Sequence, residues 1–349
     1  MNTTTLSQNG AKQAIELALR ANTPLMLYGS SGIGKSQIIK QVAEDFNLEV
    51  IDFRLSQVSP MDLLGYPKDV NGRMEYLPIA DIPIETDVIP QGKDGFLLFL
   101  DEMNSADKYT MGAAYKLTLD RQIGKYKLHP NCRVICAGNR IQDQAVVNKL
   151  VSPMKTRLTH IEMSVDAKEF LEYVYEETKA GNWHPYIYAF LNYKQDQINN
   201  FDPAVEATTY ATPRTWEMLS KQLKAGLDKL DPDLYTPIIQ GIVGDSAGMD
   251  FTAFLEHFSK FPKIQQIEVD PENAPLPNDL GAKWALGIWL SQQINKQNQQ
   301  QVIDYAARVP EPDLRVVIYR YLSLADPTIM ANPKVQSTMI QTQRLIAGI

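Results

Sequence analysis

The sequence predicts an α/β domain with a parallel sheet over residues 1–165, followed by helical regions that continue to residue 349. Two observations predict this fold class. The first 165 residues alternate short apolar runs with segments of helical periodicity, a pattern typical of strand–helix–strand units with a parallel sheet. After about residue 165 the strand-like runs stop, and apolar residues recur at helical spacing between loops rich in Pro and Asp.

Five apolar runs predict the strands of the sheet, over residues 25–28, 48–53, 96–100, 133–137 and 159–163. Helical spacing predicts helices over residues 11–21, 35–46 and 106–119. A short helix is expected to begin at Ser59-Pro60, because Ser caps helices and Pro suits the first turn. Residues 65–77 predict a hairpin, since Asn71-Gly72 is a strong hairpin signal, and residues 122–128 predict a second one.

The helical part of the chain is expected to form two regions, residues 166–262 and residues 263–349. In the first, helices are predicted over residues 166–179, 184–193, 213–224 and 252–261. A segment rich in Pro and acidic residues, 270–279, precedes the last helical block. Residues 291–301 are rich in Gln and Asn, and we interpret them as the polar end of a helix that begins near Lys283.

Composition excludes several classes of protein. The 349 residues include 34 Lys or Arg and 41 Asp or Glu, a net charge of −7, and 44% are hydrophobic, which excludes wholesale disorder. No apolar run approaches the roughly 18 residues of a membrane-spanning helix, and no secretory signal is visible at the N-terminus. Cys132 and Cys136 lie four residues apart on one predicted strand, so we expect buried free thiols and a cytoplasmic location. Four scattered histidines do not predict a zinc site.

A phosphate-binding motif lies between the first predicted strand and the helix that follows it. The residues Gly29-Ser30-Ser31-Gly32-Ile33-Gly34-Lys35-Ser36 match G-x-x-x-x-G-K-[ST] in full. Glycine lets backbone N–H groups surround phosphate oxygens, and the helix N-terminus adds partial positive charge. We therefore expect Lys35 to reach the β- and γ-phosphates of ATP and the Ser36 hydroxyl to ligate Mg²⁺.

Polar residues follow two other predicted strands. Asp101 and Glu102 end the apolar run 96–100, where carboxylates without partners are costly to bury. A magnesium–water site opposite the phosphate loop explains them, with Asp101 holding Mg²⁺ and Glu102 polarising the attacking water. Asn139 follows strand 133–137 and could orient that water or contact the γ-phosphate, although Asn after Gly is also an ordinary turn residue.

Two arginines and a basic segment complete the candidate residues. Arg157 lies just before strand 159–163, and Arg214 follows Thr212-Pro213, a helix start. Either arginine is as easily explained by surface charge as by a phosphate contact. Residues 108–157 contain ten Lys or Arg and two acidic residues, which suits a face that meets phosphates or an acidic neighbour.

Taken in this order, the motif 29–36, Asp101-Glu102, Asn139, Arg157 and Arg214 resemble the AAA+ ATPases. The string Asp101-Glu102-Met103-Asn104-Ser105-Ala106 looks like the Asp-Glu-apolar-Asn-x-Ala signature of the MoxR branch. The two predicted hairpins fall where that branch carries its helix-2 insert and the hairpin before sensor 1. The resemblance covers roughly residues 5–225, and the last stretch of about 90 residues matches no family in this way.

The resemblance implies a P-loop AAA+ core with a five-stranded parallel sheet in the order 5-1-4-3-2, an all-helical lid and a C-terminal helical region. It implies that Lys35 and Ser36 bind ATP and Mg²⁺, that Asp101 holds the metal and that Glu102 is the base. Asn139 would be sensor 1, Arg214 sensor 2, and Arg157 the arginine finger on a neighbour's ATP. The family's usual Arg-Phe is Arg157-Leu158 here, and Asn139 is followed by Arg140, so Arg140 and Lys155 remain alternative fingers.

Members of that branch form hexameric rings and often work with a von Willebrand factor A-type partner to mature or remodel a protein complex. The predicted function is therefore an ATP-hydrolysing remodelling motor that acts on protein. One alternative is a DNA-acting AAA+ motor of the clamp-loader or helicase type, which the basic segment favours. The net charge of −7 and the pI of about 5.3 disfavour it, and a salt-dependent binding assay would separate the two.

Two further alternatives remain. A nucleotide-gated scaffold that binds ATP without hydrolysing it has no need of a base, so the presence of both Asp101 and Glu102 disfavours it. A metabolite kinase would have no use for Asn139, Arg157 and Arg214 in these positions.

Overall fold

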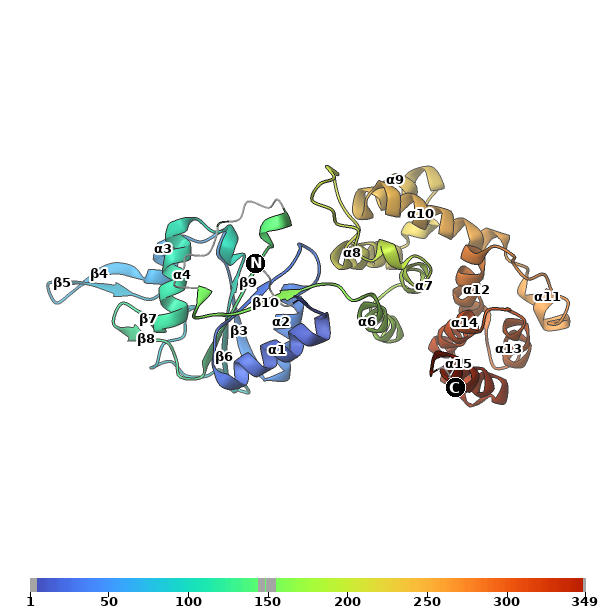
Figure 1. Ribbon diagram of the computed structural model, residues 1–349, viewed down its shortest axis with the longest axis horizontal. Helices are drawn as coiled ribbons and strands as arrows, with labels where there is room; N and C mark the ends of the chain where they lie inside the picture. The colour runs from blue at the N-terminus through green and yellow to red at the C-terminus, as the bar shows by residue number, and fades with distance from the viewer. Residues whose placement is uncertain (1–4, 144–147, 149–154, 348–349) are drawn as a thin grey trace. The chain divides into compact units, whose positions relative to one another are not determined.

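The computed structural model describes residues 5–143, 148 and 155–347. The chain divides into two compact units, Met1–Glu169 with Phe201–Glu206, and Phe170–Asn200 with Ala207–Ile349. The first unit contains the sheet and the second is helical (Figure 1). The boundaries expected at residues 165 and 262 stay predictions.

A parallel sheet of six strands forms the centre of the first unit, in the order β1-β10-β2-β9-β6-β3. Its strands are β1 (Thr5–Leu6), β2 (Leu25–Tyr28), β3 (Leu48–Arg54), β6 (Gly95–Asp101), β9 (Cys132–Gly138) and β10 (Thr159–Met163). The five predicted strands lie in the order 5-1-4-3-2, so the predicted fold class is confirmed. The sequence did not predict β1, which is two residues long and pairs with the edge of β10.

Helices cover both faces of this sheet (Figure 1). On one face, α1 (Gln8–Ala21) and α2 (Lys35–Asp45) pack against alternate strand residues such as Leu97 and Phe99. On the other face, α3 (Pro60–Leu64) and α4 (Lys108–Asp120) pack against Phe96, Leu98 and Leu100. These five residues belong to β6. Because each of their side chains packs in one apolar layer or the other, the sequence of β6 is a continuous apolar run without alternation.

Both predicted hairpins are present. The first joins β4 (Tyr66–Val70) to β5 (Arg73–Leu77), and it extends away from the sheet and its covering helices (Figure 1). Its turn residues Asn71 and Gly72 have φ angles of 54° and 79°, as a two-residue hairpin turn with both angles positive requires. The second hairpin joins β7 (Gln122–Ile123) to β8 (Tyr126–Lys127).

The remaining helices follow the sheet in the chain. They are α6 (Ala167–Lys179), α7 (Pro185–Tyr193), α8 (Pro213–Lys224), α9 (Pro232–Val243), α10 (Asp245–Glu256), α11 (Ile264–Val269), α12 (Leu280–Gln293), α13 (Gln299–Ala307), α14 (Pro312–Ala325) and α15 (Pro333–Ala347). The 3₁₀ turns are η1 (Met103–Ser105), η2 (Ile141–Asp143), η3 (Gln195–Gln197), η4 (Leu227–Lys229), η5 (His257–Lys260) and η6 (Pro327–Ala331).

Three predictions in the helical part were wrong or incomplete. The helix expected over residues 252–261 begins earlier, at Asp245, and ends at Glu256. The helix α9 was not predicted, and it contains Pro237, although proline ordinarily interrupts a helix. The Gln- and Asn-rich residues 291–301 are not the end of one helix, since α12 ends at Gln293 and α13 begins at Gln299. The Asn298 side chain accepts from the Asn295 N–H and donates to the Gln293 carbonyl, and these bonds stabilise the break between the helices.

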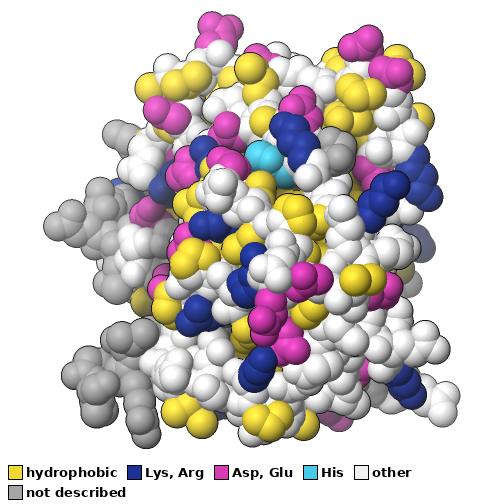
Figure 2. Space-filling model, turned by 90° about the vertical axis from the view of Figure 1, so that its right-hand side faces the viewer, with side chains coloured by type: hydrophobic (Ala, Val, Ile, Leu, Met, Phe, Trp, Pro, Cys, Tyr) yellow, Lys and Arg dark blue, Asp and Glu magenta, His cyan; other side chains and the backbone are white. Residues whose placement is uncertain are grey.

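Apolar side chains of α12, α13 and α14, such as Leu286, Ile303 and Ile318, form a core in the helical unit. On the face of the molecule shown in Figure 2, apolar side chains are interspersed with charged side chains of both signs. This distribution differs from the one-sign basic patch that is typical of a nucleic-acid interface.

The two cysteines are buried free thiols, as predicted. Burial raises the pKa of the Cys132 thiol to about 11 and that of Cys136 to about 12, so both stay protonated and unreactive at neutral pH. Within the described ranges, none of the helices combines the length and the apolar character needed to span a bilayer.

Candidate functional site

The phosphate-binding motif forms the loop between β2 and α2. Gly32 and Gly34 have φ angles of 80° and 96°, which favour glycine, and a Cβ on Gly29 would lie 2.6 Å from Cδ1 of Ile33. Gly34 is the N-cap of α2 and provides no side chain to bond the first N–H groups of the helix. The loop therefore has the tight backbone and the uncapped helix N-terminus that suit a phosphate group.

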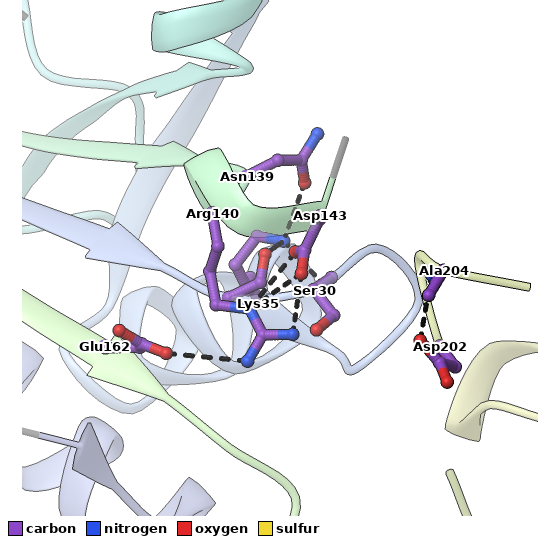
Figure 3. A network of polar contacts seen from close by, with 9 residues as sticks. Ser30, Lys35, Asn139, Arg140, Asp143, Glu162, Asp202 and Ala204 are labelled. Carbon is purple, nitrogen blue, oxygen red and sulfur yellow. Dashed lines mark hydrogen bonds and ion pairs between the residues drawn. The ribbon is translucent and has the colours of Figure 1, made fainter. Parts of the chain in front are cut away.

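Lys35 places its ammonium group inside this loop. The side chain is 8% exposed, and Nζ donates to the carbonyl oxygens of Gly29 (2.8 Å) and Ser30 (2.9 Å) and to Oδ1 of Asn139 (3.2 Å; Figure 3). These three acceptors are uncharged amide oxygens. Phosphate oxygens carry negative charge and can therefore replace them with a stronger interaction.

Ser36 and Asp101 meet at the carboxyl end of β6. The Ser36 hydroxyl donates to Oδ2 of Asp101 at 2.8 Å. A hydroxyl and a carboxylate at this separation are the oxygen ligands that Mg²⁺ prefers, and Mg²⁺ is usually held by one or two carboxylates together with substrate phosphates. In the described part of the chain, no group of three or more His, Cys, Asp or Glu could hold a metal alone. The donor set therefore fits a magnesium ion that arrives with a nucleotide.

Glu102 adopts a backbone conformation that is uncommon for residues other than glycine. Its φ angle is 56°, and its amide donates to Oδ1 of the preceding Asp101 at 2.8 Å. The Ser56 hydroxyl donates to its carboxylate. Ser56 was missed by the sequence reasoning, although it comes shortly after a predicted strand whose carboxyl end lies at this edge of the sheet.

A pair of hydrogen bonds fixes Asn139. Its backbone N–H donates to Oδ1 of Asn104 at 3.1 Å, and Nδ2 of Asn104 donates to the backbone carbonyl of Asn139 at 2.6 Å. Asn104 is 1% exposed, so this pair is shielded from water. Asn104 belongs to the signature at residues 101–106, and no role was predicted for it. The structure places its side chain where it fixes the backbone of Asn139, the residue whose Oδ1 contacts Lys35.

Gly138 makes this arrangement possible, because a Cβ there would lie 2.2 Å from Oδ1 of Asn104 and 2.7 Å from Cε of Met26. We expect Gly138→Ala to lower the free energy of unfolding by about 1–3 kcal/mol, the usual effect of overpacking. Gly112→Ala in α4 is the matched control, since a Cβ there meets nothing within 4 Å. Urea unfolding of both variants and of the wild type measures the effect. A Gly138→Ala midpoint equal to that of the control variant would contradict the prediction, because the clash would then be relieved without loss of stability.

Three other candidate residues are Arg157, Lys155 and Arg214. Arg157 is exposed, and its Nη1 donates to the Tyr115 hydroxyl at 2.9 Å; among the described residues no hydrogen bond or ion pair joins it to the phosphate-binding loop. Lys155 is exposed, and its carbonyl accepts from Nε2 of His160 at 3.1 Å when that nitrogen is protonated. Arg214 lies in the helical unit, exposed on the first turn of α8, and its expected role stays a prediction.

A comparison with protein families matches residues 25–161 to the ATPase family associated with various cellular activities (AAA). The matched range is under half of the chain, and it contains the phosphate-binding loop, Asp101, Glu102, Asn139 and Arg157.

Similar solved structures include a mutant of RuvB from Thermotoga maritima, which is 18% identical over 71% of this chain and 70% of that chain, with a TM-score of 0.41. NtrX from Brucella abortus in complex with ADP is 14% identical over 98% of this chain and 68% of that chain, with a TM-score of 0.42. Likenesses with TM-scores this low assign no function.

Proposed function

We propose that residues 25–161, which match the AAA ATPase family, form a domain of that family and that the protein binds ATP with Mg²⁺ and hydrolyses it. The observation that carries this proposal is the meeting of Lys35, Asn139 and the Ser36–Asp101 pair at the carboxyl edge of a parallel sheet. This edge is where open α/β sheets bind their ligands.

Each residue has a role that its position supports. The loop amides and Lys35 would bind the phosphates. Ser36 and Asp101 would hold Mg²⁺, which would neutralise charge on the phosphate oxygens. Glu102 accepts a proton from the attacking water, and Asn139 orients that water or contacts the γ-phosphate. These residues position the reacting groups and stabilise the charge of the transition state. Positioning and electrostatic stabilisation account for most of the catalysis of phosphoryl transfer.

We further infer that the protein is a MoxR-type motor that remodels or matures a protein complex as a homo-hexameric ring. The signature Asp101–Ala106 and the two hairpins support the assignment to this branch. The exposed Arg157 supports a ring, because its charge is available to the ATP of a neighbouring subunit. A von Willebrand factor A-type protein is the partner class that this assignment suggests, and Arg214 is the proposed sensor 2 on the helical lid.

Capture of the client tests this function. A Glu102→Gln variant should hold ATP without completing hydrolysis, and a motor that engages its client in the ATP state should then retain that client. Affinity purification with ATP, compared with ADP and with Lys35→Ala as the matched control, identifies the retained protein by mass spectrometry. A protein enriched only with Glu102→Gln and ATP supports a remodelling motor. Equal recovery from all samples would contradict it.

The β4–β5 hairpin is the proposed client-coupling element. Tyr66, Met74 and Tyr76 are exposed on it, and Lys125 of the second hairpin forms an ion pair with Glu75 at 2.6 Å. Replacing residues 69–74 by a two-residue turn should leave basal phosphate release within about twofold of the wild-type rate, because surface hairpins tolerate shortening. The same change should abolish the stimulation of phosphate release by the captured client. Met74→Ser keeps the backbone and reports on the side chain alone. Collapse of basal hydrolysis in the shortened variant would make the hairpin structural.

A further inference from the structure

The Arg140 guanidinium bridges two carboxylates at the edge of the sheet that carries the candidate site. Its Nη2 and Nε donate to Oδ1 of Asp143 at 2.7 and 3.0 Å, and its Nη1 lies 3.5 Å from Oε1 of Glu162. The Arg140 side chain is 24% exposed and the Asp143 side chain 3%. Hydrogen bonding to Asp143 raises the pKa of Arg140 above its usual value, so the guanidinium stays charged. A partly buried pair with this geometry is stronger than an exposed ion pair.

Strand register shows what this bridge crosses. Tyr28, the last residue of β2, lies opposite Gly138 of β9 on one side and opposite Glu162 of β10 on the other. Arg140 follows β9 by two residues and reaches Glu162 on β10. The guanidinium therefore spans the end of β2, where the phosphate-binding loop begins, and Figure 3 shows the bridge beside Lys35 and Ser30.

Arg140 and Arg157 differ in their availability to a neighbouring subunit. Arg140 is held by two carboxylates of its own chain, and a bidentate pair with Asp143 would have to break before it could act elsewhere. Arg157 is exposed and bonds an uncharged hydroxyl, and within the described residues no ion pair holds it. Of the arginines considered for a finger, Arg140 has the arrangement of a residue that acts within its own subunit.

We propose that Arg140 is a positioning residue that acts in cis, holding Asn139 against Lys35 by fixing the ends of β9 and β10 across the start of the phosphate-binding loop. The inference rests on the proposed ATP hydrolysis. Asn139 is the adjacent residue, and its Oδ1 lies 3.2 Å from Nζ of Lys35. The Asn104 pair holds its backbone on one side, so loss of the bridge removes the second restraint and allows this group to shift. A shift of about 1 Å in a positioning group can lower a rate about 10²-fold.

Steady-state kinetics of Arg140→Gln test the positioning role. We expect kcat to fall about 10–100-fold while KM for ATP changes less than about threefold, because the phosphate-binding loop itself is intact. Arg140→Lys should recover part of the rate, and Asp143→Asn should lower it in the same direction. The matched control is Arg133→Gln on β9, whose guanidinium bonds the carbonyls of Leu19 and Pro130 and should leave kcat unchanged. An unchanged kcat in Arg140→Gln and Asp143→Asn would make the triad an ordinary ion pair and overturn the proposal.

Mixing with Lys35→Ala separates action in cis from action in trans. A mixed ring of Lys35→Ala and Arg140→Gln has no subunit with both an intact loop and its own Arg140, so activity should stay low. Recovery of hydrolysis would show that Arg140 acts on a neighbour and would overturn the proposal. The mixture of Lys35→Ala with Arg157→Ala is the positive control for a shared site. If that control fails, the assignment of Arg157 to the neighbour's site is wrong, and the separate effects on kcat and KM still test Arg140.

Discussion

Lys35→Ala should abolish ATP binding, whereas Glu102→Gln should preserve binding and lower turnover about 10²–10⁴-fold, the usual contribution of a general base. The reason for the difference is that Lys35 interacts with the phosphates of bound ATP before any reaction, while a base acts only when water attacks. Nζ of Lys35 lies buried in the loop, and Glu102 directly follows Asp101 at the end of β6, which suits these two proposed roles.

Nucleotide titration and phosphate release measure the two effects separately. Lys40→Ala is the matched control for Lys35→Ala, since Lys40 lies on the same helix and pairs with Asp52 at 2.7 Å, away from the loop. It should bind and hydrolyse ATP like the wild type. Wild-type turnover in Glu102→Gln would remove Glu102 from the role of base.

Arg157→Ala should bind ATP and assemble yet hydrolyse ATP as much as 10³–10⁵-fold more slowly, the contribution of an arginine finger in well-studied P-loop systems. The large effect is expected because the exposed guanidinium can neutralise charge on a neighbour's γ-phosphate. Tyr115→Phe is the matched control, since it removes the hydroxyl that Arg157 contacts and leaves the arginine in place. It should change turnover only slightly. Equal losses of turnover in the two variants would indicate a structural role for the Arg157–Tyr115 pair. No loss of turnover in either variant would exclude Arg157 as the finger and make Lys155 the next candidate.

The parts of the fold that were predicted correctly are specified by short segments of the sequence itself. β2 has the predicted bounds, and β6 extends the predicted run by one residue at each end, because a strand buried on both faces is a continuous apolar run bounded by polar residues. The β4–β5 hairpin was predictable from Asn71-Gly72, whose positive φ angles few other residue pairs adopt.

The parts that were missed depend on tertiary context. β1 is two residues long and forms only because the edge of β10 offers a partner. The helix α9 accommodates Pro237 inside it, although proline ordinarily ends a helix, and its buried Ile239 and Val243 pack in the helical unit. The break between α12 and α13 depends on side-chain hydrogen bonds of Asn298 that composition does not reveal.

The same distinction applies to the candidate site. The loop at residues 29–36 and the acids Asp101 and Glu102 were predictable, because each follows a recognisable strand and parallel strands end at one edge. The contacts of Ser56, Asn104 and Arg140 were not predictable, since they depend on which strands are neighbours and in what register.

The most direct test of an ATPase whose complete site is shared by two subunits is phosphate release by a mixture of Lys35→Ala and Arg157→Ala, under conditions where mixed rings are shown to form. An Arg157→Ala subunit keeps its loop, and a neighbouring Lys35→Ala subunit keeps its Arg157, so the mixture rebuilds complete sites. We predict that it hydrolyses ATP clearly faster than either variant alone. A mixture that stays as inactive as its components would contradict a shared site with Arg157 as the residue supplied by the neighbour.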